Sequence, residues 1–298
     1  MPTLRLLAAA LGLLAATAVL SPWVAWGTQA LGFDFKFSRV WNRVLQVLLV
    51  LAVVFGWRRL DLGNATQIGL RWPHWRRDLG LGLAAGVTGV GVALFVAYLG
   101  DGVRPAVRFD DPAKMVRKAL AGLSGAMLIA VGEEALFRGV LLRRLVLDLG
   151  RSGGVAVTTA VYAVVHVLRP GGSREVYAWA GVDRVVTLFV PLADPAALPS
   201  IVGLAALGAL LAWATLRTGS LWTAIGIHAA FVAVFRVGRL FVNIRRKPAW
   251  LMGPGWPPLI GGVAGLLAVA LTGVLLWWAL RRRALRGAEP VPTLAARA

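Results

Sequence analysis

Glu133, Glu134 and Arg138 lie close together in a stretch that is otherwise apolar, from Gly122 to Leu142. An ionisable group in hydrocarbon costs several kcal/mol unless it is paired or faces a water-filled cavity, and such groups mark functional sites in membrane proteins. Two acids and one base in so small a region are hard to attribute to packing alone. We interpret this segment as the centre of a functional site.

Helical spacing gives the two acids different surroundings. Glu134 and Arg138 are four residues apart, so their side chains share one helix face and can form an ion pair. Glu133 is rotated by about 100° from Glu134 at 3.6 residues per turn, so it faces a different neighbour. The alternative is a buried ion pair that only holds the bundle together, and this alternative leaves Glu133 unexplained.

Two histidines, His166 and His228, also lie in apolar segments, whereas His74 lies in a basic loop and is expected to be inert. Tyr162 precedes His166 by one turn on the same helix face. A lone histidine in an apolar helix is usually a packing residue, but here two of them accompany a spare carboxylate. The combination predicts a hydrolytic site.

Two hydrolytic schemes fit these residue types. In the first, Glu133 is a general base that takes a proton from water, while a histidine stabilises the oxyanion. In the second, Glu133, His166 and His228 hold a zinc ion with an open position for water. The spacing is not that of a His-Glu-x-x-His helix, so three different helices would have to supply the ligands. The residues alone leave both schemes open.

The elements that carry these residues are expected to be membrane-spanning helices. Of the 298 residues, 58% are hydrophobic and 15% are charged, against about 45–50% and about 25% in soluble domains. The chain has no cysteine, which excludes disulfides and thiolate metal sites. The sequence therefore predicts an all-α, polytopic integral membrane bundle of about eight transmembrane helices. The approximate spans are Leu4–Trp26, Val40–Trp57, Leu79–Leu99, Val116–Leu147, Gly153–Leu168, Leu198–Leu216, Leu221–Val237 and Leu259–Leu280.

The net charge of +19 does not by itself indicate a nucleic-acid partner. Basic residues gather at the ends of apolar runs, as at Arg58-Arg59, Arg143-Arg144 and Arg281–Arg283. The positive-inside rule and contact with anionic lipid both predict this placement. We therefore expect a lipid bilayer and no nucleic acid as the surroundings. Gly82 and Gly86 have the small-xxx-small spacing that predicts close helix packing in lipid.

In its charged motifs the chain resembles the CAAX protease and bacteriocin-processing family (CPBP, or Abi), which includes the Ras-converting prenyl-protein endopeptidases. The first family motif, Glu-Glu-x-x-x-Arg, matches Glu133-Glu134-Ala-Leu-Phe-Arg138. The second, Phe-x-x-x-His, matches Tyr162-Ala-Val-Val-His166 with Tyr in place of Phe. The third, His-x-x-x-Asn, begins at His228 and has Val232 in place of Asn. The resemblance covers about Leu120 to Val237, with the motifs in the family's order.

The resemblance implies an intramembrane endopeptidase. In it Glu133 would activate water, His166 would assist or orient that water, and His228 would help to stabilise the oxyanion. The family is described both as metalloproteases and as glutamate-dependent proteases. We favour the glutamate scheme without a cofactor, and zinc held by Glu133, His166 and His228 is the alternative. The other motif residues would be structural or supporting: Glu134, Arg138 and Tyr162.

Two alternative functions stay open, and Val232 bears on the first of them. An amide donor aimed at the oxyanion is worth about 10²–10³ in rate, and a valine side chain cannot donate. This departure favours a non-catalytic binding or immunity protein of the membrane. A proton-coupled transporter is a further alternative, because intramembrane Glu and His also suit proton relays.

The expected partner is a membrane-anchored or hydrophobic peptide or protein substrate. The high content of Ala, Gly, Arg and Val suggests a GC-rich bacterial genome, so we expect the bacterial inner membrane as the location. Three regions are expected along the chain. They are N-terminal transmembrane helices over residues 1–115, a catalytic core over 116–240, and a last transmembrane helix with a basic cytoplasmic tail over 241–298.

Overall fold

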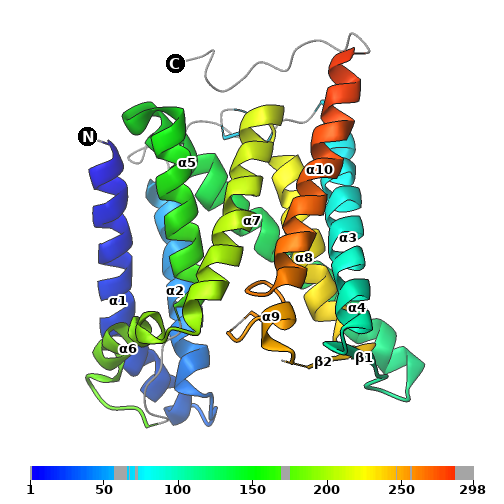
Figure 1. Ribbon diagram of the computed structural model, residues 1–298. Coiled ribbons are helices and arrows are strands. Elements are labelled where there is room, and N and C mark those ends of the chain that lie inside the picture. The colour runs from blue at the N-terminus through cyan, green and yellow to red at the C-terminus, as the bar shows by residue number, and fades with distance from the viewer. Residues whose placement is uncertain are drawn as a thin grey trace. The chain divides into compact units, whose positions relative to one another are not determined.

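The computed structural model describes residues 2–56, 66, 68–70, 73–168, 175–245, 247–255 and 257–285 (Figure 1). Contacts between residues divide the chain into two units, Met1–Gly63 with His166–Pro195, and Asn64–Val165 with Ala196–Ala298. We call them the first and the second unit. The predicted cluster Arg58-Arg59 and the basic tail beyond residue 285 lie outside the described residues. The division at residues 115 and 240 concerns function rather than packing, and it stays a prediction.

The first unit is built on α1 (Pro2–Ala30), α2 (Phe37–Gly56) and the short helix α6 (Ala180–Leu188), which is followed by a 3₁₀ turn over Val190–Ala193. Both α2 and α6 pack against α1. The closest approach is at Gly181, where an added Cβ would lie 1.8 Å from the carbonyl oxygen of Ala18. Helix α6 has nine residues, about 14 Å at 1.5 Å per residue, so it is too short to cross a bilayer.

The second unit contains the remaining elements. Its glycines allow α3 and α8 to approach closely, because an added Cβ at Gly82 would lie 2.2 Å from the carbonyl oxygen of Thr223. At Gly226, on the facing helix, an added Cβ would lie 2.4 Å from the carbonyl oxygen of Leu79. The close packing predicted for Gly82 and Gly86 is thus confirmed. The elements are α3 (Trp75–Leu99), β1 (Val103–Pro105), α4 (Pro112–Glu134), a π-helix η1 (Ala135–Leu142), α5 (Arg143–Val167), α7 (Ala197–Thr218), α8 (Leu221–Gly238), β2 (Val242–Ile244), α9 (Ala249–Met252) and α10 (Val263–Leu285).

Local sequence signals explain where several of these helices begin and end. Asp111 caps α4, and its carboxylate accepts from the backbone N–H of Ala113 at 2.9 Å, as expected for an N-cap aspartate followed by proline. Helix α7 ends at Gly219, which has φ 62°, the left-handed conformation that glycine adopts without strain. Ser220 then caps α8 by accepting from the N–H of Trp222 at 3.3 Å. The two residues between α7 and α8 therefore form a tight helical hairpin.

Six of the described helices are long and apolar enough to cross a membrane. The longest, Pro112–Val167, contains α4, η1 and α5 and departs from helical geometry at Gly150, where φ is 71° and ψ 173°. The chain is a polytopic helical membrane protein, as its composition predicted, and the count of eight spans stays a prediction. The small antiparallel pair of β1 and β2 was not predicted, because strands of three residues leave no readable periodicity.

Candidate active site

A change of helix type occurs at the acidic pair. Helix α4 ends at Glu134, and the next eight residues form the π-helix η1. The wider π turn is rare and is found mostly at functional sites. The sequence-based expectation of a regular α-helix through Arg138 was therefore wrong in this detail. The predicted ion pair nevertheless forms, with Arg138 Nη1 donating to Glu134 Oε1 at 2.9 Å.

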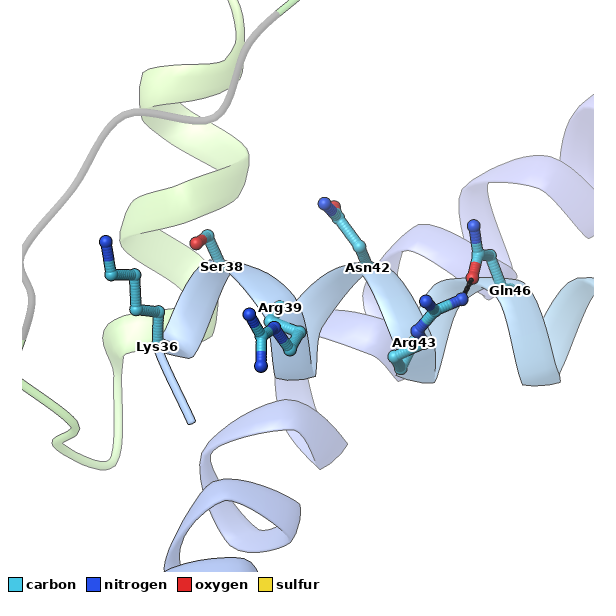
Figure 2. A pocket seen from close by; sticks show the side chains of 6 residues that line it. All are labelled: Lys36, Ser38, Arg39, Asn42, Arg43 and Gln46. Atoms are coloured by element: carbon cyan, nitrogen blue, oxygen red, sulfur yellow. Dashed lines mark hydrogen bonds between the residues drawn. The ribbon is translucent and has the colours of Figure 1, made fainter. Parts of the chain in front are cut away.

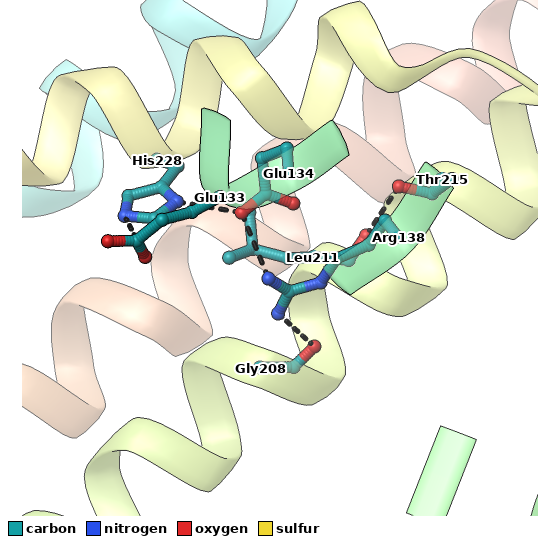
Figure 3. A network of polar contacts seen from close by, with 7 residues as sticks. All are labelled: Glu133, Glu134, Arg138, Gly208, Leu211, Thr215 and His228. Carbon is teal, nitrogen blue, oxygen red and sulfur yellow. Dashed lines mark hydrogen bonds and ion pairs between the residues drawn. The ribbon is translucent and has the colours of Figure 1, made fainter. Parts of the chain in front are cut away.

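Arg138 is enclosed by partners from three helices. Its side chain is fully buried, and its Nη2 donates to the carbonyl oxygen of Gly208 on α7 at 3.1 Å (Figure 3). The guanidinium carbon lies 4.3 Å from the ring centroid of Tyr162 on α5, within the range of a cation–π contact. Gly208 leaves room for this arrangement, because an added Cβ would meet the Tyr162 ring at 3.0 Å. The Arg138 cation, which is on η1, therefore contacts residues of α4, α5 and α7.

His228 on α8 shares the same buried acid. Its Nδ1 lies 2.7 Å from Glu134 Oε1, and its ring meets Tyr162 edge to face with centroids 6.2 Å apart. Glu134 is paired with Arg138 and is therefore an acceptor at both contacts, so Nδ1 of His228 carries the proton. This hydrogen bond orients the ring and leaves Nε2 as the nitrogen available to a ligand. No local pattern in the sequence signals this contact, since Glu134 and His228 are 94 residues apart.

Glu133 lies on the other side of His228. Its side chain is 34% exposed, and its Oε2 is 3.8 Å from His228 Nε2. That separation exceeds a direct hydrogen bond but can be bridged by one water. Figure 3 shows the imidazole between the two carboxylates, with Glu134 at one nitrogen and Glu133 at the other. The two acids thus differ as the helical spacing predicted, one buried in an ion pair and one open to other groups.

His166 completes the cluster. It is the next-to-last residue of α5, and the division between the two units cuts this helix just before it. Because α5 remains helical through Val167, the helix that carries Tyr162 also places His166. Glu133, His166 and His228 each offer one ligand atom, and these atoms all lie within 4.8 Å of one another. One carboxylate and two imidazoles fit the donor types that zinc prefers. The same set also fits a carboxylate base with two imidazole neighbours.

The position that departs from the family motif is Val232, four residues after His228 and half-buried on α8. Thr223, on the same helix, carries a hydroxyl that could replace the missing amide as a donor to the oxyanion. Its hydroxyl is buried and has no hydrogen-bond partner among the described residues. However, Thr223 precedes His228 by five residues, about 140° around the helix. Thr223 therefore does not share the face that His228 and Val232 occupy.

Residues 116–234 match the model of a protein family described as type II CAAX prenyl endopeptidase Rce1-like. The match contains all three members of the Glu133, His166 and His228 cluster and agrees within a few residues with the segment from Leu120 to Val237. No curated protein and no solved structure matches the chain significantly.

Proposed function

The segment from residue 116 to residue 234 belongs to the Rce1-like family of type II CAAX prenyl endopeptidases, and from this premise we propose that the chain is an intramembrane endopeptidase. Its substrate is a peptide or protein that a lipid group or an apolar segment holds in the membrane. The observation that carries the proposal is the cluster of Glu133, His166 and His228, whose ligand atoms lie within 4.8 Å of one another. Such a cluster among apolar helices is more than packing requires.

In the proposed reaction Glu133 is the general base. It takes a proton from a water molecule, and the water oxygen attacks the carbonyl carbon of the scissile peptide bond. The negative charge that develops on the carbonyl oxygen is stabilised by the Nε2–H of a His228 imidazolium, and His166 assists or orients the water. The proton then passes from Glu133 to the leaving nitrogen as the C–N bond breaks. Atoms and charge balance without a further reactant.

The hydrogen bond from His228 to Glu134 fixes which charge state of the ring each way of activating water requires. Because Nδ1 carries a proton, Nε2 can donate to an oxyanion only when the ring is an imidazolium, and it offers a lone pair when the ring is neutral. The glutamate scheme uses the imidazolium. If zinc is bound, Glu133, His166 and His228 would hold it, and the metal would supply a water of lowered pKa. We favour the glutamate scheme, in which no cofactor is needed.

Composition supports a bacterial setting for this activity. The high content of Ala, Gly, Arg and Val is typical of a GC-rich genome, where prenylated CAAX proteins are not expected. We therefore propose the bacterial inner membrane as the location. On this argument the substrate is a membrane-anchored protein or a secreted peptide under maturation rather than a prenylated protein.

Replacement of Glu133 by Gln tests the proposal. General-base catalysis contributes about 10²–10⁴ in rate, so Glu133→Gln should reduce cleavage by that factor while the protein stays in the membrane. The measurement is quantitative mass spectrometry of the termini of membrane proteins from cells that carry each variant. The control is Glu175→Gln, the same chemical change at an exposed acid of the other unit, which should leave the termini unchanged. Full cleavage by Glu133→Gln would remove the general base from the proposal.

Chelation of the purified protein separates the two water-activation schemes. Under the glutamate scheme cleavage survives treatment with a zinc chelator. Loss of cleavage on chelation, with return on addition of zinc alone, would assign the water to the metal.

A non-catalytic membrane protein is the second candidate, and Val232 is the observation that favours it. Under this candidate cells that lack the chain, cells with the wild type and cells with Glu133→Gln all produce identical sets of termini. Adding cells that lack the chain to the same mass spectrometry experiment therefore decides between the two functions.

A further inference from the structure

Helix α2 of the first unit has two unlike faces in its first half. Phe37, Val40, Trp41 and Val44 are buried and recur at the three- and four-residue spacing of one helix face. They pack with residues of α1 and α6 in one core cluster. The opposite face of the same segment is polar and mostly exposed. A helix in a membrane protein does not present such a face to hydrocarbon, so the polar face needs an aqueous or headgroup environment.

The polar face forms a shallow, open pocket of about 340 Å³ (Figure 2), within the size range of small-ligand sites. Arg43 Nη1 donates to Gln46 Oε1 at 2.7 Å, and the Arg39 guanidinium lies 5.6 Å from the ring centroid of Phe35. These contacts hold two of the cations in place. The lining contains three cations and no acid: Lys36, Ser38, Arg39, Asn42, Arg43 and Gln46. Cations with amide and hydroxyl donors recognise a phosphate group.

The ridge of i+4 neighbours that carries Arg39 and Arg43 becomes apolar farther along the helix. Val47, Leu51 and Phe55 follow at four-residue intervals and are 56%, 43% and 77% exposed. From Arg43 to Phe55 the helix rises about 18 Å at 1.5 Å per residue, against about 15 Å for half of the hydrocarbon core. Each step of four residues turns about 40° around the helix, so this apolar ridge begins beside Arg43 at Val47 and ends at Phe55, about 120° around the helix from Arg43. The ridge therefore offers a charged end and a winding apolar strip about as long as an acyl chain.

Aromatic residues mark the charged end of α2 as the level of the membrane surface. Trp23 and Trp26, near the end of α1, have ring centroids 5.2 Å apart, and Trp23 is exposed. Phe33 and Phe35, in the link between α1 and α2, are stacked at 5.7 Å. Aromatic side chains gather in this way where a membrane meets water.

We propose that this face of α2 is a binding site for an anionic phospholipid. The phosphate occupies the basic pocket, and an acyl chain lies along Val47, Leu51 and Phe55. The apolar ridge favours a lipid over a free phosphate, because a free anion makes no use of it. The site lies wholly within the first unit and does not depend on the proposed endopeptidase activity.

Lipid retention by the purified full-length chain tests this site. The probe is phosphatidylglycerol, titrated against the protein in neutral detergent and counted as adducts by native mass spectrometry, with phosphatidylcholine as the neutral comparison. Each basic residue near an anionic surface strengthens binding severalfold, so removing three should weaken binding about a hundredfold. We expect this loss for the combined Lys36→Gln, Arg39→Gln and Arg43→Gln variant. Equal binding by this variant and the wild type would overturn the proposal.

A charge-matched variant and a competitor complete the test. Lys114→Gln, Arg117→Gln and Lys118→Gln, at the exposed start of α4, remove the same charge and should leave binding within about threefold. An equal loss there would mean attraction by net charge alone and would reject the site. Inorganic phosphate should not displace the lipid at equal concentration, and full displacement would assign the pocket to free phosphate instead. Leu51→Ala with Phe55→Ala should weaken long-chain but not short-chain phosphatidylglycerol, and no change for either lipid would reject the acyl-chain contact.

Discussion

A single carboxylate oxygen links the charged residues at the centre of the candidate site. Glu134 Oε1 accepts from Arg138 at 2.9 Å and from His228 at 2.7 Å, and all three side chains are buried. Ions in such a place are stable only while each retains its partners, because the desolvation cost is already present. Removal of one member of the pair is therefore expected to lower the stability of the fold more than the contact distances alone would indicate.

Arg138→Met should leave the buried Glu134 charge with His228 as its remaining partner among the described residues. Loss of one member of a buried pair typically costs about 3–5 kcal/mol, and the free energy of unfolding should fall by that amount. The measurement is denaturant unfolding in detergent, followed by helical circular dichroism. The matched control combines Arg138→Met with Glu134→Gln, which removes both charges and should restore most of the stability. A double variant no more stable than Arg138→Met alone would contradict an uncompensated charge as the cause.

Residue spacing predicted the ion pair of Glu134 with Arg138. It did not predict the contacts with His228 and Gly208, for a physical reason. The four-residue spacing of Glu134 and Arg138 is a local rule, and it was sufficient for their ion pair. The contact of Glu134 with His228 depends on how α4 packs against α8, which no local pattern encodes. Gly208 takes part through its backbone carbonyl, so its side chain carries no signal of that role. Close packing at glycine was readable only where two glycines recur, as at Gly82 and Gly86.

At the scale of elements, the position of the His228 side chain depends on how α8 packs against its neighbours. Helix α3 meets α8 through glycine, since Gly82 lies against the backbone of Thr223 and Gly226 against that of Leu79. Close backbone approach of this kind is a main source of helix association in lipid. The packing of α3 is therefore expected to control the position of the imidazole on α8.

Gly82→Ala should separate α3 from α8. The added Cβ would lie 2.2 Å from a backbone oxygen of α8, and overpacking of this kind typically costs about 1–3 kcal/mol. Thermal unfolding in detergent should show a lower midpoint, and substrate cleavage should fall with it. The control is Gly80→Ala on the same helix, where an added Cβ meets nothing within 4 Å, and it should be neutral or slightly stabilising. Equal midpoints for the two variants would refute the packing argument.

Helix boundaries were predictable to the extent that local signals set them. The start of α4 at Pro112 precedes the predicted Val116, because the Asp111 cap extends the helix beyond the apolar run. The start of α2 at Phe37 precedes the predicted Val40, because its first turn carries the polar face described above. Hydropathy alone places a helix by its apolar part. The π-helix η1 and strands β1 and β2 depend on tertiary contacts, so they had no such signal.

At the scale of the whole molecule, two sets of contacts hold the opposite ends of α3 and α8 in the second unit. Strand β1, after α3, pairs with β2, after α8, and Asp101 accepts from Arg104 at 2.7 Å and also from Arg245. The hydrogen bond from Arg104, reinforced by Arg245, lowers the pKa of Asp101 below its ordinary value. At the other ends of the same helices, the N–H of Leu221 donates to the carbonyl oxygen of Gly69 at 2.9 Å. Both ends of α3 and α8 are thus held by direct contacts.

The two sets of contacts should face opposite sides of the membrane. Helix α8 has 18 residues, about 27 Å at 1.5 Å per residue, which matches a hydrocarbon core of about 30 Å. The chain lacks cysteine, so single cysteines at exposed positions can be labelled without a background. With a membrane-impermeant maleimide on sealed cells, Asp110→Cys and Arg239→Cys should react alike, because β1 and β2 hold their loops together. Arg217→Cys, beyond the other end of α8, should react oppositely and become equal to them only after permeabilisation. Labelling of Arg217→Cys and Arg239→Cys from the same side of sealed cells would show that α8 does not cross the bilayer, and the candidate site would then lie outside the membrane.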